Sequence, residues 1–358
     1  MINCPITGSL NTKIIYEQKS VPLLQNKVYE NMNEALQAPL IDVTLTQSQL
    51  NGFVFNGTFD ENLISYDQDY QNEQSNSNIF QKHLQNVIEI LGKNNMLGKK
   101  IIEIGCGKGY FFDLLISKGE HATGFDPTYE GNSSKIIKDF FSDKYSKIEA
   151  ETIILRHTLE HIKSPLKFIQ SIANSNNKKG HIFIEVPTFD WIVENDAIED
   201  VFHEHCNYFT LETLQQFFDN SIGGYFFNKQ YIWVIGDLAS VRDILPEIQI
   251  KEHKINFQEK LNDYNQLLKK MENIAVWGAG AKGSTFLNLV DKSKKKVKCV
   301  IDINPKKQHR YMGGTGHFII KPEEIDQYKI ENIIVMNSNY LEEIKAMLPD
   351  QKIKLHTL

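Results

Sequence analysis

Two short segments bring histidines and carboxylates close together, RHTLEH at 156–161 and FHEHCNYF at 202–209. Histidine gains and loses a proton near neutral pH, so both segments are candidates for acid–base chemistry, although a lone histidine is more often structural. His157 and His161 are four residues apart, which would place them on one helix face and could allow a metal ion to bind. Neither segment has the HExxH spacing of a zinc protease, and we expect no metal site.

A glycine-rich segment, IIEIGCGKG at 101–109, follows an apolar run and precedes a helical pattern. Glycine adopts positive φ and lets the backbone approach a ligand closely, so this segment is typical of a ligand-binding turn between a strand and a helix. Its spacing is GxGxG, which differs from the GxGxxG of dinucleotide-binding turns. The candidate binding positions are Gly105, Gly107 and Gly109.

Two carboxylates accompany this first glycine turn. Glu103 stands at the end of the predicted strand, where it would suit an ammonium group, and Asp126 stands at the end of the next one. A carboxylate in the second position can accept hydrogen bonds from both hydroxyls of a ribose, and open α/β sheets bind ligands at this edge. The alternative is a tight strand-to-helix turn in another kind of α/β protein.

A second glycine turn, WGAGAKG at 277–283, does match GxGxxG, and Asp302 follows Gly283 by 19 residues. An acid near that position binds the ribose 2′-hydroxyl of NAD, so a nicotinamide-binding domain is one interpretation. The motif alone is weak evidence, and a ligand-free Rossmann-like support domain is the other interpretation. Lys282, at the start of the following helix, could reach a substrate phosphate.

Strand and helix patterns alternate around these motifs, which predicts an α/β fold with mostly parallel sheets. The first unit has predicted strands at 101–104, 121–127, 152–155 and 181–187 and a pair of strands within 225–236. Its predicted helices begin at residue 79, cover 211–219, and continue from the strand at 152–155 through RHTLEH. We expect four parts in the chain: a small N-terminal module over 1–78, an α/β domain over 79–244, a connecting helix over 245–273 and a second α/β domain over 274–358.

The composition excludes several classes of protein. With 358 residues, 41% hydrophobic and 23% charged, the chain is typical of a globular protein of two or three domains. The net charge of −6 provides no basic field for nucleic acid, no apolar run is long enough to cross a membrane, and the first residues do not resemble a secretory signal. The four cysteines form no CxxC pair, so we expect a reduced, cytoplasmic protein.

The first glycine turn, with Glu103 and Asp126 in register, resembles that of the class I S-adenosyl-L-methionine (SAM)-dependent methyltransferases. The resemblance implies SAM as methyl donor and S-adenosylhomocysteine (SAH) as product. The cofactor-binding residues would be Glu103, Gly105, Gly107, Gly109, Asp126 and His157.

From about residue 65 onward, the set of motifs resembles the sugar C-methyltransferases of deoxysugar pathways, which methylate a carbon of a nucleotide-linked 4-keto sugar. The landmarks in this chain are RHTLEH, FHEHCNYF, WGAGAKGST at 277–285 and VIDINP at 300–305. Members of this family have a small N-terminal zinc module, a methyltransferase domain and a C-terminal Rossmann-like domain that helps to hold the substrate without a nicotinamide.

The same resemblance assigns catalytic and substrate-binding roles. His205 would be the general base that removes a proton next to a ketone, Glu204 would orient or tune its imidazole or contact the sugar, and His161 would line the site. Substrate contacts would come from Tyr70, Phe202, Tyr208 and Lys282.

The chain departs from the family's pattern on the acceptor side. Only Cys4 remains of the N-terminal cysteines, whereas a zinc site needs four ligands, so we expect no zinc. Phe202 stands where the family has a tyrosine that could polarise a keto oxygen, and Asn72 replaces a second tyrosine near Tyr70. An acceptor O–H or N–H, being more acidic than a C–H, would need less help from the missing hydroxyl.

We therefore expect a class I SAM methyltransferase domain, a second, C-terminal Rossmann-like domain and a small N-terminal module. The expected function is methyl transfer to a small sugar-like or nucleotide-sugar acceptor, with no nucleic-acid or membrane partner. The alternatives are an NAD-dependent oxidoreductase built on the second glycine turn and a non-catalytic protein that binds SAM or a nucleotide.

Overall fold

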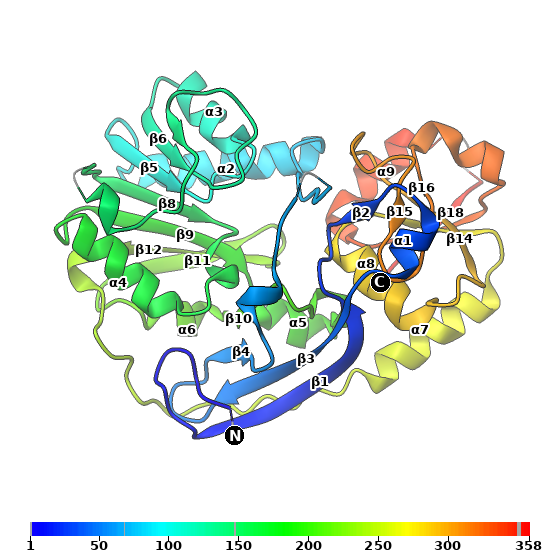
Figure 1. The fold of residues 1–358 in the computed structure, drawn as a ribbon, viewed down its shortest axis with the longest axis horizontal. Coiled ribbons are helices and arrows are strands. Elements are labelled where there is room, and N and C mark those ends of the chain that lie inside the picture. The colour runs from blue at the N-terminus through cyan, green and yellow to red at the C-terminus, as the bar shows by residue number, and fades with distance from the viewer. Residues whose placement is uncertain (1, 68, 147, 349–351) are drawn as a thin grey trace.

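The computed structural model describes residues 2–67, 69–146, 148–348 and 352–358. Two α/β units lie side by side, and N-terminal strands run along one side of both (Figure 1). We call the α/β unit from Asn78 to Asp237 the central unit and the one from Gln258 to Thr357 the C-terminal unit. No helix in the described ranges is long and apolar enough to span a membrane.

The central unit is built on a seven-stranded sheet in the spatial order β11-β12-β9-β8-β5-β6-β7. Neighbours from β9 to β7 are parallel, whereas β12 runs antiparallel to both β9 and β11. The strands are β5 (Lys100–Ile104), β6 (His121–Phe125), β7 (Ile136–Ile137), β8 (Thr152–Arg156), β9 (His181–Pro187), β11 (Ser221–Phe226) and β12 (Tyr231–Asp237).

Helices cover both faces of this sheet because its inner strands are apolar on both sides. Successive side chains point to opposite faces, so Ile102 packs in one core with α4 and α6, while Ile101 packs in the other with α2 and α3. These helices are α2 (Asn78–Lys93), α3 (Tyr110–Ser117), α4 (Pro165–Ser175) and α6 (Leu211–Gln215), whereas α5 (Phe189–Asn195) packs in the core of the C-terminal unit and the N-terminal strands.

The C-terminal unit has a five-stranded sheet, all parallel, in the order β16-β14-β13-β17-β18. Its apolar strands are again covered on both faces, by α7 and α8 on one side and by α9 on the other. The elements are α7 (Gln258–Lys270), β13 (Ile274–Trp277), α8 (Ala281–Val290), β14 (Val297–Ile301), β16 (Ile319–Ile320), β17 (Asn332–Val335), α9 (Leu341–Met347) and β18 (Lys354–Thr357).

The N-terminal segment is tied to both units by strand pairing. Its sheet has the order β1-β3-β4-β10, and the fourth strand comes from the central unit. A second pairing joins β2 to β15 of the C-terminal unit. The elements are β1 (Thr12–Pro22), β2 (Val28–Tyr29), α1 (Met32–Leu36), β3 (Leu40–Ser48), β4 (Val54–Asn56), β10 (Asn207–Tyr208) and β15 (Tyr311–Met312). The expected domain limits stay a prediction.

Three predicted helices differ from the structure. RHTLEH does not form one: the backbone N–H of His157 still bonds Glu185 of β9, its φ is +47°, and only a 3₁₀ turn at Leu159–His161 follows. His157 and His161 therefore do not share a helix face. The helix predicted at 211–219 ends at Gln215, because Phe217 and Phe218 turn into the core. In the predicted connecting helix, the polar stretch 245–257 before α7 is not helical.

The buried ring of Phe209 joins the N-terminal sheet to the central unit, since its ring centroid lies 5.5 Å from that of Phe53 and 6.0 Å from that of Phe217. We expect Phe209→Ala to lower the free energy of unfolding by about 3–5 kcal/mol, because it leaves a cavity in this core. Phe140, 72% exposed, is the control, and Phe140→Ala should change stability by less than about 0.5 kcal/mol. Urea denaturation measures both, and equal effects would contradict the prediction.

Candidate active site

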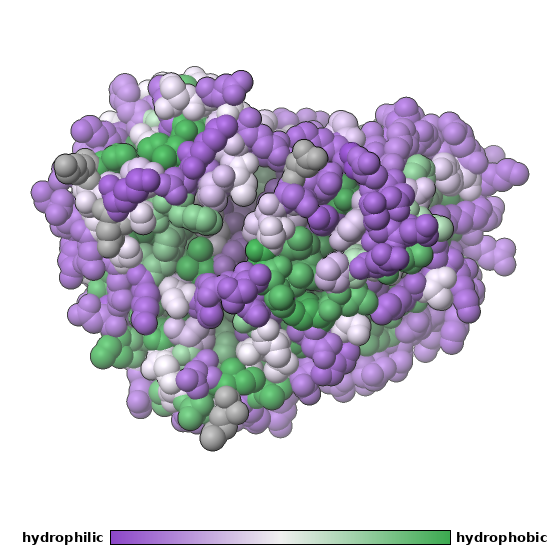
Figure 2. All heavy atoms as spheres, viewed as in Figure 1, coloured by the Kyte–Doolittle hydropathy of each residue, from purple (hydrophilic) through white to green (hydrophobic). Residues whose placement is uncertain are grey.

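One cavity of about 440 Å³ lies where the units meet, and both glycine turns and both histidine segments line it. That volume is in the range of small-molecule sites. Figure 2 shows the hollow between the two halves of the largely hydrophilic face. The cavity is lined by ten of the thirteen predicted site residues: Tyr70, Glu103, Gly105, Gly107, His157, His161, Phe202, His205, Tyr208 and Lys282. The remaining three are Gly109, Asp126 and Glu204.

The first glycine turn needs glycine for two different reasons. Gly105 has φ +76°, and a Cβ there would lie 2.2 Å from Oγ1 of Thr158. The turn approaches the loop after the neighbouring strand β8 too closely for a side chain at this position. Gly107 has φ +56° and faces open space on its Cβ side. Gly109, with φ +87°, begins α3. The turn thus presents bare backbone to the cavity.

The two predicted acids differ in their surroundings. Asp126 supports the turn: its Oδ2 accepts from the N–H of Gly107 at 2.8 Å and its Oδ1 from the N–H of Thr128 at 2.8 Å. Glu103 is 2% exposed, and its Oε2 has no hydrogen-bond partner among the described residues. Burial raises the pKa of Glu103 to about 7. A buried carboxylate without a partner fits a cationic group of a ligand, as the ammonium of SAM provides.

His205 faces the cavity through ring contacts alone. Its ring centroid lies 4.2 Å from that of Phe202 and 5.0 Å from that of His161, and no hydrogen bond to either ring nitrogen is found in the described part of the chain. Burial, together with the neighbouring His161 and His157, lowers the pKa of His205 well below its usual value. Nδ1 of His161 lies 2.9 Å from the carbonyl oxygen of Glu204, which fixes Nδ1 as the donor and leaves Nε2 free.

The Glu204 side chain lies beside two tyrosines. Its Oε2 accepts from the N–H of Gln25 at 2.5 Å, while its buried Oε1 makes no well-formed hydrogen bond. Burial raises the pKa of Glu204, and the hydroxyls of Tyr70 and Tyr66 act against that increase. The two rings are 4.5 Å apart. Sequence analysis missed Tyr66. The resembled family has its second tyrosine two residues after Tyr70, where this chain has Asn72, whereas Tyr66 lies four residues before Tyr70.

Tyr208 offers the cavity only its ring. Its hydroxyl donates to the carbonyl oxygen of Phe202 at 2.9 Å and accepts from the N–H of the same residue at 3.1 Å. The hydroxyl of Tyr208 therefore uses its donor and an acceptor position to close the 202–208 loop, and this loop holds Phe202 and His205 in place.

The second glycine turn is explained by its own packing. A Cβ on Gly283 would lie 2.0 Å from the carbonyl oxygen of Gly278, so helix and strand approach too closely for a side chain. Asp302 accepts from the N–H groups of Ala279 at 2.7 Å and Asn304 at 2.8 Å. No nucleotide is needed to account for the motif.

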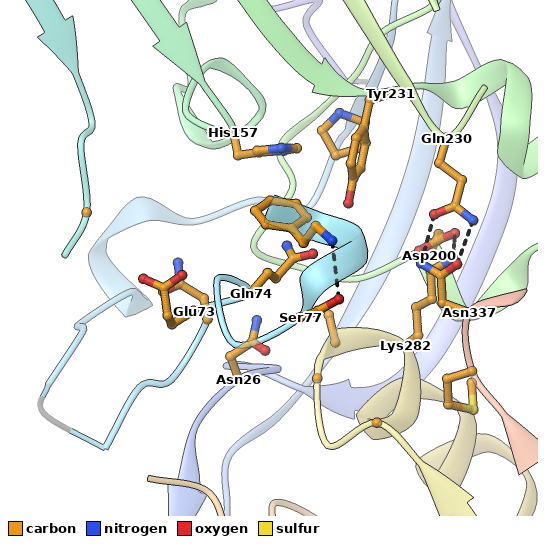
Figure 3. A pocket seen from close by; sticks show the side chains of 18 of the residues that line it. Asn26, Glu73, Gln74, Ser77, His157, Asp200, Gln230, Tyr231, Lys282 and Asn337 are labelled. Carbon is orange, nitrogen blue, oxygen red and sulfur yellow. Dashed lines mark hydrogen bonds and ion pairs between the residues drawn. The ribbon is translucent and has the colours of Figure 1, made fainter. Parts of the chain in front are cut away.

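Contacts across the cavity join the two units. Lys282 forms an ion pair with Asp200, and the side-chain amides of Gln230 and Asn337 exchange hydrogen bonds at 2.9 and 3.0 Å (Figure 3). Lys282 therefore has a carboxylate partner already. Sequence analysis missed Lys307, which is buried, lines the cavity and donates to the carbonyl oxygen of Ala279 at 2.9 Å.

Two clusters in the described ranges have the ligand types of a metal site, His83–His157–Glu185 and Glu160–His161–His205. In the first, Glu185 already pairs with His83 at 2.5 Å and with Arg156 at 2.6 Å. The second lines the cavity, and Oε2 of its buried Glu160 has no partner. That the protein uses no metal stays a prediction.

A seven-stranded sheet of this order, with a GxGxG turn after β5 and an acid after β6, defines the fold of the class I SAM-dependent methyltransferases. Comparison of the sequence with known families agrees. The family described as "Methyltransferase domain" matches residues 75–221, and "C-methyltransferase C-terminal domain" matches residues 247–353. Residues 75–221 thus match a methyltransferase domain and residues 247–353 the C-terminal domain of C-methyltransferases, in agreement with the expected SAM-dependent methyltransferase, whereas a sugar acceptor stays a prediction.

The chain is similar over part of its length to individual methyltransferases. It is 28% identical over 109 residues to a ubiquinone biosynthesis O-methyltransferase of Haemophilus ducreyi, covering 25% of this chain and 46% of that protein. It is 24% identical over 135 residues to the C-methyltransferase NovU of Streptomyces niveus, covering 34% and 32%. A SAM-dependent methyltransferase structure from Archaeoglobus fulgidus covers 42% of this chain and 93% of its own, with 16% identity and a TM-score of 0.34. The chain spans less than half the length of these two curated relatives.

The clash that a side chain at position 105 would make with Thr158 can be distinguished from the cost of a positive φ by comparing two glycine substitutions. Gly98 also has positive φ, +73°, but nothing lies within 4 Å of its Cβ position. Gly98→Ala should cost only about 1–2 kcal/mol of unfolding free energy for the backbone. Gly105→Ala should cost more and weaken SAH binding at least tenfold, because the turn must move. Calorimetric titration and thermal unfolding test this, and equal SAH affinities in both variants would contradict it.

Proposed function

We propose that the protein transfers the methyl group of SAM to a carbon atom of a small, sugar-like acceptor that carries phosphate groups, with His205 as the general base. The observation that supports this most is the position of His205. It lines the same cavity as the first glycine turn, and its ring nitrogens are not hydrogen-bonded within the described part of the chain.

A general base must be unprotonated when it meets the substrate. Because burial lowers the pKa of His205, its imidazole is neutral at physiological pH. SAM supplies an electrophilic methyl group. His205 would accept the proton of a carbon next to a ketone, the electron pair left on that carbon would form the bond to the methyl, and the S–CH₃ electrons would stay on sulfur. Holding both partners in one cavity supplies much of the rate.

The proton is acidic enough to remove only if the ketone oxygen is polarised. Phe202 has no hydroxyl to do this, but Tyr70 lines the cavity. Burial and the nearby Glu204 raise the pKa of Tyr70 well above its usual value, so it remains a hydrogen-bond donor. We infer that Tyr70, supported by Glu204 and Tyr66, takes over this role.

Lysines of both units at the cavity support an acceptor with phosphate groups. Lys307 is buried, and that burial lowers its pKa. Lys108 donates to Oε1 of Gln71 at 2.6 Å, and its burial, together with the neighbouring Lys306, lowers the pKa of Lys108. Lys306 also pairs with Glu130 at 3.4 Å, so Lys307 and Lys108 are the candidates to bind an anion. Lys282, already paired with Asp200, is the weaker candidate.

Carbon is the preferred acceptor atom because the C-terminal match is to a C-methyltransferase domain. The test is incubation with SAM and a nucleotide-linked 4-keto deoxysugar, with the product analysed by mass spectrometry and NMR. We expect one carbon-bound methyl group and one SAH per turnover. An O- or N-linked methyl would overturn the carbon acceptor, and NAD binding without SAH binding would overturn the methyltransferase itself.

The base can be tested by substitution. His205→Asn should lower kcat by about 10²–10⁴-fold while leaving the SAH dissociation constant within about twofold, because the base contributes to proton transfer. His121, exposed at the start of β6, is the matched control, and His121→Asn should keep full turnover. Unchanged kcat in His205→Asn would refute the role of His205.

The pH dependence follows from the direction of the pKa shift. A base with a lowered pKa keeps its activity as the pH falls below the ordinary histidine value of 6.5, so the acidic limb of kcat should lie under pH 6.5. The profile should be measured at saturating SAM, since Glu103, with a pKa of about 7, affects SAM binding. A limb above pH 6.5 would contradict the assignment.

A further inference from the structure

Two buried side chains of opposite charge stand at the carboxyl ends of neighbouring strands. Glu103 lies at the end of β5 and Arg156 ends β8, which runs parallel to it. Arg156 is 9% exposed, both residues line the cavity, and the guanidinium partly offsets the increase that burial causes in the pKa of the Glu103 carboxyl. They form no ion pair with each other in the described part of the chain. Each keeps a buried atom without a partner, Oε2 of Glu103 and Nη2 of Arg156.

Arg156 is held rigidly by one edge of its guanidinium. Its Nε donates to Oε2 of Glu185 at 2.6 Å, and its Cζ lies 4.6 Å from the ring centroid of Phe111 in α3. Glu185 is fully buried and also binds Nε2 of His83 from α2 at 2.5 Å. Its pKa is low despite burial, because Arg156 and His83 favour the carboxylate. The guanidinium is therefore fixed while its other nitrogens stay available.

Buried polar atoms without a hydrogen-bond partner are costly, and a ligand that satisfies both Oε2 of Glu103 and Nη2 of Arg156 must offer a donor and an acceptor close together. An α-amino acid does, with its ammonium and carboxylate on one carbon. The methionine part of SAM has this group, and both side chains adjoin the first glycine turn.

We propose that Arg156 binds the α-carboxylate of SAM while Glu103 accepts its ammonium, so that the two form a clamp for the amino-acid group. Glu185 is a positioning residue that acts through Arg156. This assignment rests on the proposed function, because it requires SAM as the ligand. It adds a cofactor-binding residue to those that the sequence motifs predict.

The clamp predicts a loss of affinity that depends on the ligand. SAH carries the amino-acid group, whereas 5′-methylthioadenosine keeps the adenosine and thioether without it. Arg156→Lys retains a positive charge for Glu185 but loses the planar fork, so we expect SAH binding to weaken at least tenfold and methylthioadenosine binding to stay within twofold. Calorimetric titration measures both constants.

Two controls separate the clamp from general damage. Asp126→Asn should weaken both ligands by similar factors, since the Asp126 carboxylate holds the backbone of the first glycine turn through the N–H of Gly107. Arg242, whose Nε pairs with Asp219 at 2.8 Å, is a matched ion-paired arginine, and Arg242→Lys should leave both ligands unchanged. Equal losses for both ligands in Arg156→Lys, or no loss for either, would overturn the clamp.

A structure of the unmodified protein with SAH tests the assignment without a variant. We expect a carboxylate oxygen of SAH at about 2.7–2.9 Å from a guanidinium nitrogen of Arg156. A carboxylate bound elsewhere would refute the clamp alone. Failure of the unmodified protein to bind either ligand would instead refute SAM as the cofactor, which distinguishes the two failures.

Discussion

The floor of the cavity is made of buried charges, and the need of each charge for a partner organises the structure around it. A carboxylate or guanidinium removed from water is tolerated only when paired or hydrogen-bonded. Glu185 meets this need by binding Arg156 of β8 and His83 of α2, so one side chain locks two strands and a helix together. Oε2 of Glu103 and Nη2 of Arg156 remain without partners, and both residues line the cavity, where a ligand could complete them.

The two α/β units meet with the carboxyl edges of their parallel strands toward the same space. Each edge carries a glycine turn, yet the turns differ in what they leave free. In the first, Gly107 faces open space and Glu103 has an unpaired oxygen. In the second, Asp302 is bonded to the backbone, and the close packing of Gly283 accounts for the motif. A similar sequence pattern thus occurs in two settings, beside an unpaired buried carboxylate in one unit and with its acid bonded to the backbone in the other.

The apolar strands of the two α/β sheets were largely predictable from sequence, because apolar runs of four to seven residues between breakers are typical of buried strands. The acids at the ends of β5 and β6 were predictable for the same reason, since strand ends fix their location. The RHTLEH helix was predicted wrongly, because spacing cannot reveal the positive φ of His157. The ion pair of Lys282 with Asp200, 82 residues apart, depends on how the units meet.

Other site residues could not have been recognised from their types alone. Arginine, lysine and tyrosine are common at surfaces, and Arg156, Lys307 and Tyr66 gain significance only from what surrounds them. Burial without a full set of partners distinguishes Arg156 from the other arginines, and that property exists only in the folded chain.

The pairing of β4 with β10 has a consequence for the order of synthesis. β4 ends at Asn56, but its partner at Asn207 leaves the ribosome about 150 residues later, so the contact is strongly non-local. Until then β4 is an unprotected edge of a nascent sheet, and such edges can pair with the wrong chain. With only three residues, β4 offers little to a wrong partner. The sheet of the N-terminal segment, although translated before the central unit, can be completed only after most of that unit has been made.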